Sequence, residues 1–125
     1  MMSFNQVVFL GNVGRDSDMQ ETPDKTPVAR FSMAVSTYAG KDESGKAKSE
    51  AMWLTVNCWR DLAIQVKKVV TKGALVLVSG RLAIRKYTDK NGQEQTSVEV
   101  VAHAVEVIMS KAKQADSEPD NEQAA

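Results

Sequence analysis

Both tryptophans of the chain lie within one short alternating stretch, residues 51–59, which reads Ala-Met-Trp-Leu-Thr-Val-Asn-Cys-Trp. Successive side chains of a strand point to opposite faces of a sheet, so Trp53 and Trp59 would share the polar face. The opposite, core face would hold Leu54, Val56 and Cys58. The two indoles would lie about 20 Å apart at about 3.3 Å per residue. Exposed flat rings at this spacing can stack several bases of a single nucleic-acid strand.

Cationic side chains accompany these rings on or beside the polar faces of the other predicted strands. The cations that this pattern offers to phosphates are Arg30, Arg60, Arg81, Arg85 and Lys86. Tyr38 and Tyr87 add further rings. A single strand needs both features, because its bases stack on rings and its phosphates attract Arg and Lys. A reader of duplex grooves would instead need a recognition helix or ribbon, and the sequence offers no obvious one.

Each of these features also has a purely structural interpretation. Either tryptophan could serve a dimer interface, and Tyr87, close to a hairpin turn, could pack across strands as readily as contact a base. Cys58 would point inward as a small buried hydrophobe. His103, the only histidine, has no acid, thiol or metal-ligand pattern near it. We therefore expect a binding protein and not an enzyme, with no metal and no cofactor.

The elements that must position these residues are mainly strands. Alternation and β-forming residues predict strands over residues 4–13, 28–38, 51–59, 74–87 and 93–108. A helix should begin at Asp61, as N-cap or first-turn acid, and end at Lys72 before Gly73. Residues 17–26 and 39–50 are interpreted as an exposed connection and a flexible loop, and Asn91-Gly92 as a hairpin turn. The inner face of residues 74–87 should hold Val76, Val78, Gly80, Leu82 and Ile84.

The order strand, strand, strand, helix, strand, strand is that of a five-stranded OB-fold barrel. We therefore predict an all-β domain over residues 1–110, with one short helix between strands 3 and 4. Residues 111–125 contain no bulky apolar side chain, so we expect a short, acidic and disordered tail.

Charge and composition narrow the class of protein. The chain carries 16 basic and 16 acidic residues, but residues 1–110 hold 14 basic against 12 acidic ones. The neutral total thus conceals a slightly basic body and an acidic end. One cysteine cannot form an intramolecular disulfide, and no apolar run approaches the ~18 residues of a membrane span. With no secretory signal at the start, we expect a cytoplasmic protein that does not enter a membrane.

Several motifs in combination resemble the bacterial single-stranded DNA-binding protein family. They include Leu-Gly-Asn-Val-Gly-Arg-Asp at residues 10–16 and Arg-Lys-Tyr-Thr-Asp-Lys-Asn-Gly-Gln at residues 85–93. Residues 28–35, 53–59 and 72–82 also match, and the likeness runs from Asn5 to about Met109. It implies an OB fold, usually assembled as a homotetramer. Such proteins coat single-stranded DNA in replication, recombination and repair with little sequence preference, which places them at the nucleoid.

The resemblance also implies roles for particular residues. Trp53, Trp59 and Tyr87 fall where the family places base-stacking aromatics. Lys72 and Lys86 fall at cationic positions of the DNA path, and Arg60 lies next to another. A further stacking tryptophan of the family is Ala39 here. Tyr38, one residue earlier, would replace it if a local twist or bulge re-aims the ring.

The end of the chain departs from the family pattern. The family commonly ends in an acidic, apolar tip that recruits replication and repair proteins, whereas this chain ends Glu122-Gln123-Ala124-Ala125. We expect such recruitment to be weak or absent, and the alternative role for the tail is competition for the basic surface. One rival interpretation is a dimeric OB accessory of replication restart. The other is a nuclease on an OB scaffold, for which the sequence offers no HxE or CxxC motif.

Overall fold

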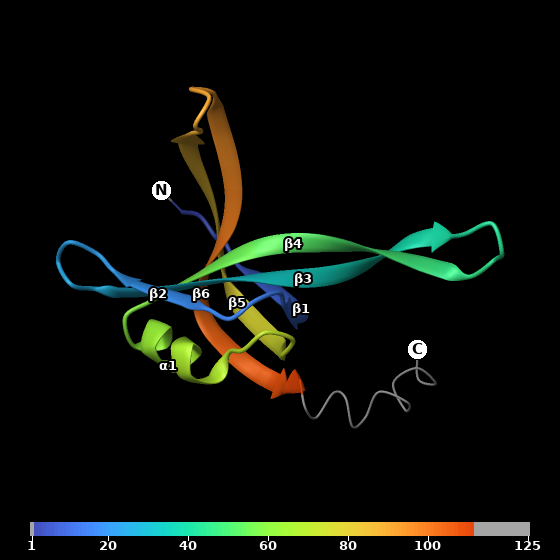
Figure 1. Cartoon of the computed structure of the whole chain (residues 1–125), viewed down its shortest axis with the longest axis horizontal. Coiled ribbons are helices and arrows are strands. Elements are labelled where there is room, and N and C mark those ends of the chain that lie inside the picture. The colour runs from blue at the N-terminus through green and yellow to red at the C-terminus, as the bar shows by residue number, and fades with distance from the viewer. Residues whose placement is uncertain (1, 112–125) are drawn as a thin grey trace.

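Strands of alternating apolar and polar residues make up most of residues 2–111, the part of the chain that this computed structural model describes. They are β1 (Val7–Val13), β2 (Asp18–Glu21), β3 (Pro27–Lys41), β4 (Ala47–Trp59), β5 (Leu75–Thr88) and β6 (Glu94–Met109). The helix α1 (Asp61–Val69) connects β4 to β5 and lies at one end of the sheet (Figure 1). The predicted tail lies outside the described residues, apart from Lys111.

The strands close into a ring. Hydrogen-bonded neighbours follow the order β1-β5-β6-β4-β3-β2, and an additional pairing of β1 with β3 joins the two ends of the five main strands. The β4–β6 pairing, from Thr55↔Glu99 to Asn57↔Val101, is parallel, and the other pairings are antiparallel. This confirms the predicted OB-fold barrel of five strands with its helix between the third and fourth of them.

The inside of the ring is apolar. Its largest fully buried side chains include Phe31, Met33, Val56, Val66, Val76, Val78 and Val100. On β4 the predicted alternation is confirmed, because Leu54, Val56 and Cys58 are buried. The exposed fractions of Trp53 and Trp59 are 62% and 42%. Burial also raises the pKa of the Cys58 thiol to about 12, which keeps it protonated and inert.

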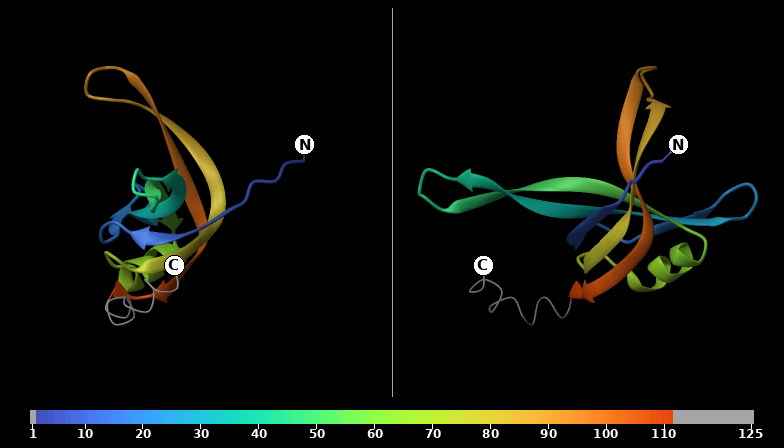
Figure 2. Two further views of the ribbon diagram at one scale, coloured as in Figure 1. Left: turned by 90° about the vertical axis from the view of Figure 1, so that its right-hand side faces the viewer. Right: turned by 180° about the vertical axis from the view of Figure 1, so that it is seen from behind.

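Two long hairpins leave the barrel as arms. The β3–β4 hairpin and the β5–β6 hairpin project from the ring in different directions, as the other views confirm (Figure 2). The prediction of a flexible loop over residues 39–50 is therefore wrong, because the strands continue to Lys41 and resume at Ala47. An arm beyond the barrel has no core to face, so its charged sequence carries no apolar alternation.

Other boundaries also differ from prediction. Within the predicted connection of residues 17–26, β2 pairs with β3, although all of its residues are exposed and so show no apolar signal. Leu82 and Ile84 are not inner residues, because β5 has left the barrel there and Ile84 is 65% exposed. The helix begins at Asp61, which supplies the predicted first-turn acid, but it ends at Val69 rather than Lys72.

Three hairpin tips share one backbone geometry. In the arm tips, the carboxylate of Asp42 or Asp89 accepts hydrogen bonds from the backbone N–H groups two and four residues later. The residue three positions on is Gly45 or Gly92, with φ of 87° and 79°. The β2–β3 tip repeats this backbone hydrogen bonding, but its left-handed position is occupied by Lys25 with φ 66°. Only this tip places a side chain in a conformation that favours glycine.

Replacing Lys25 by glycine should raise the free energy of unfolding by about 0.5–1 kcal/mol. Relief of the left-handed conformation contributes about 1–2 kcal/mol, and the greater freedom of glycine in the unfolded chain offsets about 0.4–1 kcal/mol of it. Urea denaturation of both chains measures the difference. Lys25→Ala serves as the control, because it removes the same side chain and keeps the unfavourable φ. Equal stability of the glycine and alanine variants would contradict the expectation.

Candidate nucleic-acid interface

The polar faces of β3 and β4 form one continuous surface. The register pairs Val28 with Trp59, Arg30 with Asn57 and Ala34 with Trp53, and directly paired residues share a face. The register continues without a shift to Tyr38, opposite Ser49, and changes only between Tyr38 and Lys41. Tyr38 therefore lies on the same face as both tryptophans without any bulge to re-aim it, and its side chain is 69% exposed.

Trp53 rests on the backbone of Gly14. A methyl group built at Gly14 would lie 2.6 Å from Cζ3 of Trp53, so the absence of a side chain there makes room for the indole. Gly14 also donates its N–H to the carbonyl of Ser32 on β3, which fixes this floor beneath the ring. One side of the indole thus lies against the barrel while much of its surface stays exposed.

A concave groove of about 680 Å³ continues this surface from Trp59 toward β5 and β6. Arg30 and Asn57 line it from β3 and β4, and Arg85 and Glu99 from β5 and β6. The strands bring these side chains together because the parallel pairing places Asn57 opposite Val101, two residues from Glu99. The groove therefore spans the parallel junction of β4 with β6.

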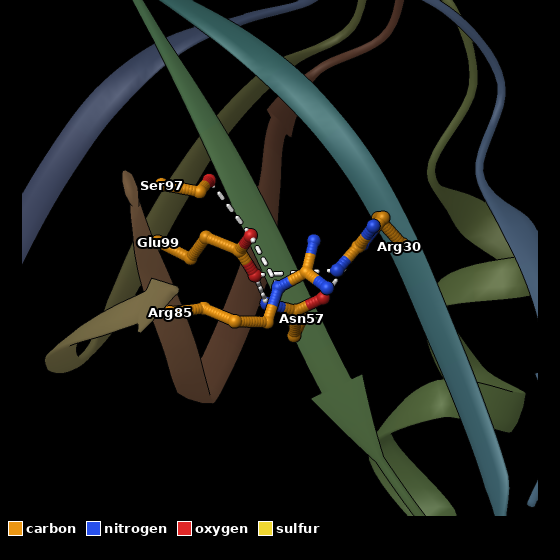
Figure 3. Close-up of polar contacts among 5 residues, drawn as sticks. All are labelled: Arg30, Asn57, Arg85, Ser97 and Glu99. Atoms are coloured by element: carbon orange, nitrogen blue, oxygen red, sulfur yellow. Dashed lines mark hydrogen bonds and ion pairs between the residues drawn. The ribbon is translucent and has the colours of Figure 1, made fainter. Parts of the chain in front are cut away.

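Glu99 lies at the centre of a polar network in the groove (Figure 3). Its Oε1 accepts hydrogen bonds from Asn57 Nδ2 at 2.6 Å and from Arg30 Nη2 at 3.2 Å. Its Oε2 accepts from Ser97 Oγ at 2.8 Å and from Arg85 Nε at 3.2 Å. Arg30 Nε also donates to Asn57 Oδ1 at 2.9 Å. These contacts connect β3, β4, β5 and β6 across the groove.

The Glu99 carboxylate is buried, ionised and fully bonded. Only 4% of the residue is exposed. Burial raises its pKa, but the hydrogen bonds from Asn57, Ser97 and Arg85 and the charge of Arg30 outweigh that effect, and the pKa lies below its ordinary value. A carboxylate offers about four lone-pair sites, and the four donors fill them. Glu99 thus has no acceptor left for a ligand.

The stabilisation that Glu99 gives to the fold should disappear in acid. A carboxyl with a lowered folded-state pKa contributes fully above its unfolded pKa and loses the contribution as the pH falls through the folded value. Relative to Glu99→Gln, the wild-type chain should gain about 1–3 kcal/mol of unfolding free energy at neutral pH. This difference should shrink from near the ordinary pKa of 4.5 downward.

Urea denaturation of both chains at a series of pH values measures that difference. The lowered pKa values of Asp24, Asp42 and Asp89 affect both chains equally and cancel in the comparison. A difference that stays constant into strong acid would show that the charge of Glu99 contributes nothing to stability.

Tyr87 extends the surface onto the β5–β6 arm. The guanidinium carbon of Arg85 lies 5.4 Å from the centroid of the Tyr87 ring, within the range of a cation–π contact. The ring is half-exposed and lies opposite Gln95. Cross-strand packing and an open stacking surface therefore coexist at this residue.

The remaining predicted cations lie at different places around the surface. Arg81 is exposed and shares the face of Arg85, because residues two and four apart on a strand point the same way. Lys86 points to the opposite face for the same reason. Lys72 lies in the connection after α1, where its N–H donates to Asp16 Oδ1. Arg60 directly follows Trp59 at the helix start. Only Arg30 and Arg85 of the predicted cations line the groove.

Sequence reasoning did not identify Glu99 as a residue of the site. Its contacts with Arg30 and Asn57 depend on the parallel β4–β6 register, for which a single sequence contains no signal.

Within residues 2–111, no group of His, Cys, Asp and Glu is arranged to hold a metal ion. No helix in that range is long and apolar enough to cross a membrane.

Several known proteins are similar to this chain in sequence or in structure. The profile of the "Single-strand binding protein family" matches residues 4–108. The single-stranded DNA-binding protein of Neisseria meningitidis serogroup B is 33% identical over 107 residues, which cover 86% of this chain and 61% of that protein. Single-stranded DNA-binding protein 1 of Streptococcus agalactiae serotype V is 34% identical over 119 residues, covering 94% of this chain and 70% of that one.

The chain is shorter than several of these relatives, since it spans about three fifths of the Neisseria protein. Among solved structures, a Plasmodium falciparum SSB in complex with ssDNA superimposes with a TM-score of 0.73. The match has 24% sequence identity and covers 87% of this chain and 97% of that one. At this sequence identity, the similarity supports the fold alone.

Proposed function

Because the chain belongs to the single-strand binding protein family, we propose that it binds single-stranded DNA without catalysing a reaction on it. The observation that carries this proposal is the exposure of both tryptophans on one face, beside a groove lined by arginines. Bases are flat and apolar, so they would stack on Trp53, Trp59, Tyr87 and, along the first arm, Tyr38. Stacking is insensitive to base identity, which accounts for little sequence preference.

Phosphates would meet the cations around these rings. We propose Arg60, Lys72 and Arg81 as phosphate ligands, because each lies at the edge of the stacking surface or in a connection next to the barrel. Lys86 would serve a strand that wraps around the second arm, since its side chain faces away from the groove. Neutralisation of phosphates releases counterions, so log affinity should fall with log salt by about 0.7 per phosphate contacted.

The biological role that fits this chemistry is coating of single-stranded DNA during replication, recombination and repair in the bacterial cytoplasm. A homotetramer would multiply the stacking surface and lengthen the strand bound per assembly.

Titration of the purified chain with oligo-dT of increasing length tests the proposal. Quenching of tryptophan fluorescence reports binding, the length dependence reports site size, and the mass of free and bound protein reports the assembly. Saturable quenching by oligo-dT with a tetrameric mass is expected. A dimer would instead favour the replication-restart accessory. Cleavage of labelled single strands in Mg²⁺ would favour a nuclease, and the absence of any binding would end the proposal.

A further inference from the structure

We propose that Glu99 is a positioning residue of the binding surface: it holds the guanidinium groups of Arg30 and Arg85 as flat stacking surfaces between Trp59 and Tyr87. This inference rests on the proposed single-strand binding. It assigns Arg30 and Arg85 a role different from the phosphate contacts that their charge predicts. It also gives a function to a buried carboxylate in a surface that should attract anions.

The first support is the use that each arginine already makes of its donors. A guanidinium binds a phosphate best through two parallel N–H groups on one edge. Arg30 commits the edge formed by Nε and Nη2 to Asn57 and Glu99. Arg85 commits Nε to Glu99. Each arginine has therefore lost one of its phosphate-binding edges to the protein, while about half of each side chain stays exposed to a base.

The second support is the saturation of Glu99. All four of its lone-pair sites are filled by protein donors, so the carboxylate cannot receive a base or a sugar hydroxyl. Its charge also offsets one of the two arginine charges, which lowers the attraction of this spot for phosphate. A group that weakens phosphate binding and takes no ligand contributes to binding only through the geometry that it imposes.

The third support is the continuity of flat groups across the strands. Arg85 lies over the ring of Tyr87 at 5.4 Å, and Arg30 pairs with Asn57, two residues before Trp59 on β4. The side chains of Arg30 and Arg85 are 47% and 53% exposed, so ligand can reach both. Along β6, Tyr87 lies opposite Gln95, Arg85 opposite Ser97 and Asn57 opposite Val101, so the register places Arg85 and the Arg30–Asn57 pair between the two rings. Bases stack on guanidinium planes as they do on aromatic rings.

Salt-dependent binding of oligo-dT separates this role from simple electrostatics. Glu99→Gln keeps the size of the side chain but removes the charge and half of the acceptor sites. If Glu99 only repels phosphate, its removal should strengthen binding at low salt and leave the affinity at about 1 M salt unchanged. If Glu99 positions the arginines, affinity extrapolated to about 1 M salt should fall about fivefold or more. The slope of log affinity against log salt should steepen, because the released arginines can then meet phosphates.

Glu94→Gln is the matched control, because it removes the same charge from an exposed position of the same strand. This variant should bind slightly more tightly at low salt and equally well at about 1 M salt. The positioning role is overturned if the affinity of Glu99→Gln for oligo-dT equals or exceeds that of the wild type at all salt concentrations. A wild-type chain that does not bind oligo-dT at all instead overturns the proposed function, so the two failures are distinguishable.

Arg85→Lys keeps the inference testable if Glu99→Gln does not fold, which thermal unfolding will show. Lysine retains the charge and can meet a phosphate but has no flat face. We expect an unchanged salt slope with about a fivefold or larger loss of affinity at about 1 M salt. Unchanged affinity at high salt would identify Arg85 as a phosphate ligand and overturn the inference.

Discussion

Replacing Trp53 and Trp59 together by alanine will lower the affinity for oligo-dT at least about thirtyfold. Each lost base–aromatic stack costs about 1–3 kcal/mol, so two independent stacks cost about 2–6 kcal/mol. Both rings are exposed in the structure, and the core side of β4 is formed by Leu54, Val56 and Cys58. The double variant should therefore fold, and its loss of affinity should reflect the removal of ligand contacts.

Competition binding with a labelled oligo-dT measures this effect, because the variant has no tryptophan left to quench. Trp53→Phe and Trp59→Phe serve as controls, since each keeps a flat ring and should bind within a few-fold of wild type. The salt slope should stay the same in the double variant, because no cation is removed. An affinity within a factor of two of wild type would show that the rings serve another surface, such as a dimer interface.

The face of each strand could be predicted wherever the barrel provides an inside. Alternation along residues 51–59 placed both tryptophans outward, because the apolar residues between them must fill a core. The same rule failed beyond the barrel, where Ile84 continues the inward series of β5 but has no core to enter. It also could not reveal β2, whose short strand is exposed at every residue.

The site could be predicted as a set of residue types but not as a geometry. Tyr38 shows the difference: counting in steps of two from Ala34 places it on the face of the tryptophans, whereas the resemblance to the family pointed to residue 39. Lys86 shows the opposite case: the resemblance places it on the DNA path, but alternation along the strand turns its side chain away from Arg85. The partnership of Glu99 with Arg30 depends on a parallel strand pairing between distant segments, which no local pattern encodes.

Replacing Gly80 by alanine will destabilise the barrel by about 3 kcal/mol or more, at the upper end of what overpacking a core usually costs. Gly80 lies where β5 is paired on both sides, with Val7 of β1 and Ala102 of β6, directly after a register shift. A methyl group there would lie 2.1 Å from the carbonyl oxygen of Val101 and 2.8 Å from the Cα of Ala102. Both contacts are with backbone, so relief requires moving a strand of the closed ring.

The matched control for this substitution is Gly14→Ala. A methyl group at Gly14 would approach Cζ3 of Trp53, but that atom belongs to an exposed side chain that can shift. Its free energy of unfolding should therefore change by less than about 1 kcal/mol, since surface substitutions usually have small effects. Urea denaturation of the wild type, Gly80→Ala and Gly14→Ala measures the free energies of unfolding. Equal and small losses in both variants would mean that β5 can move away from β6 at Gly80, and that close backbone packing there does not hold the ring closed.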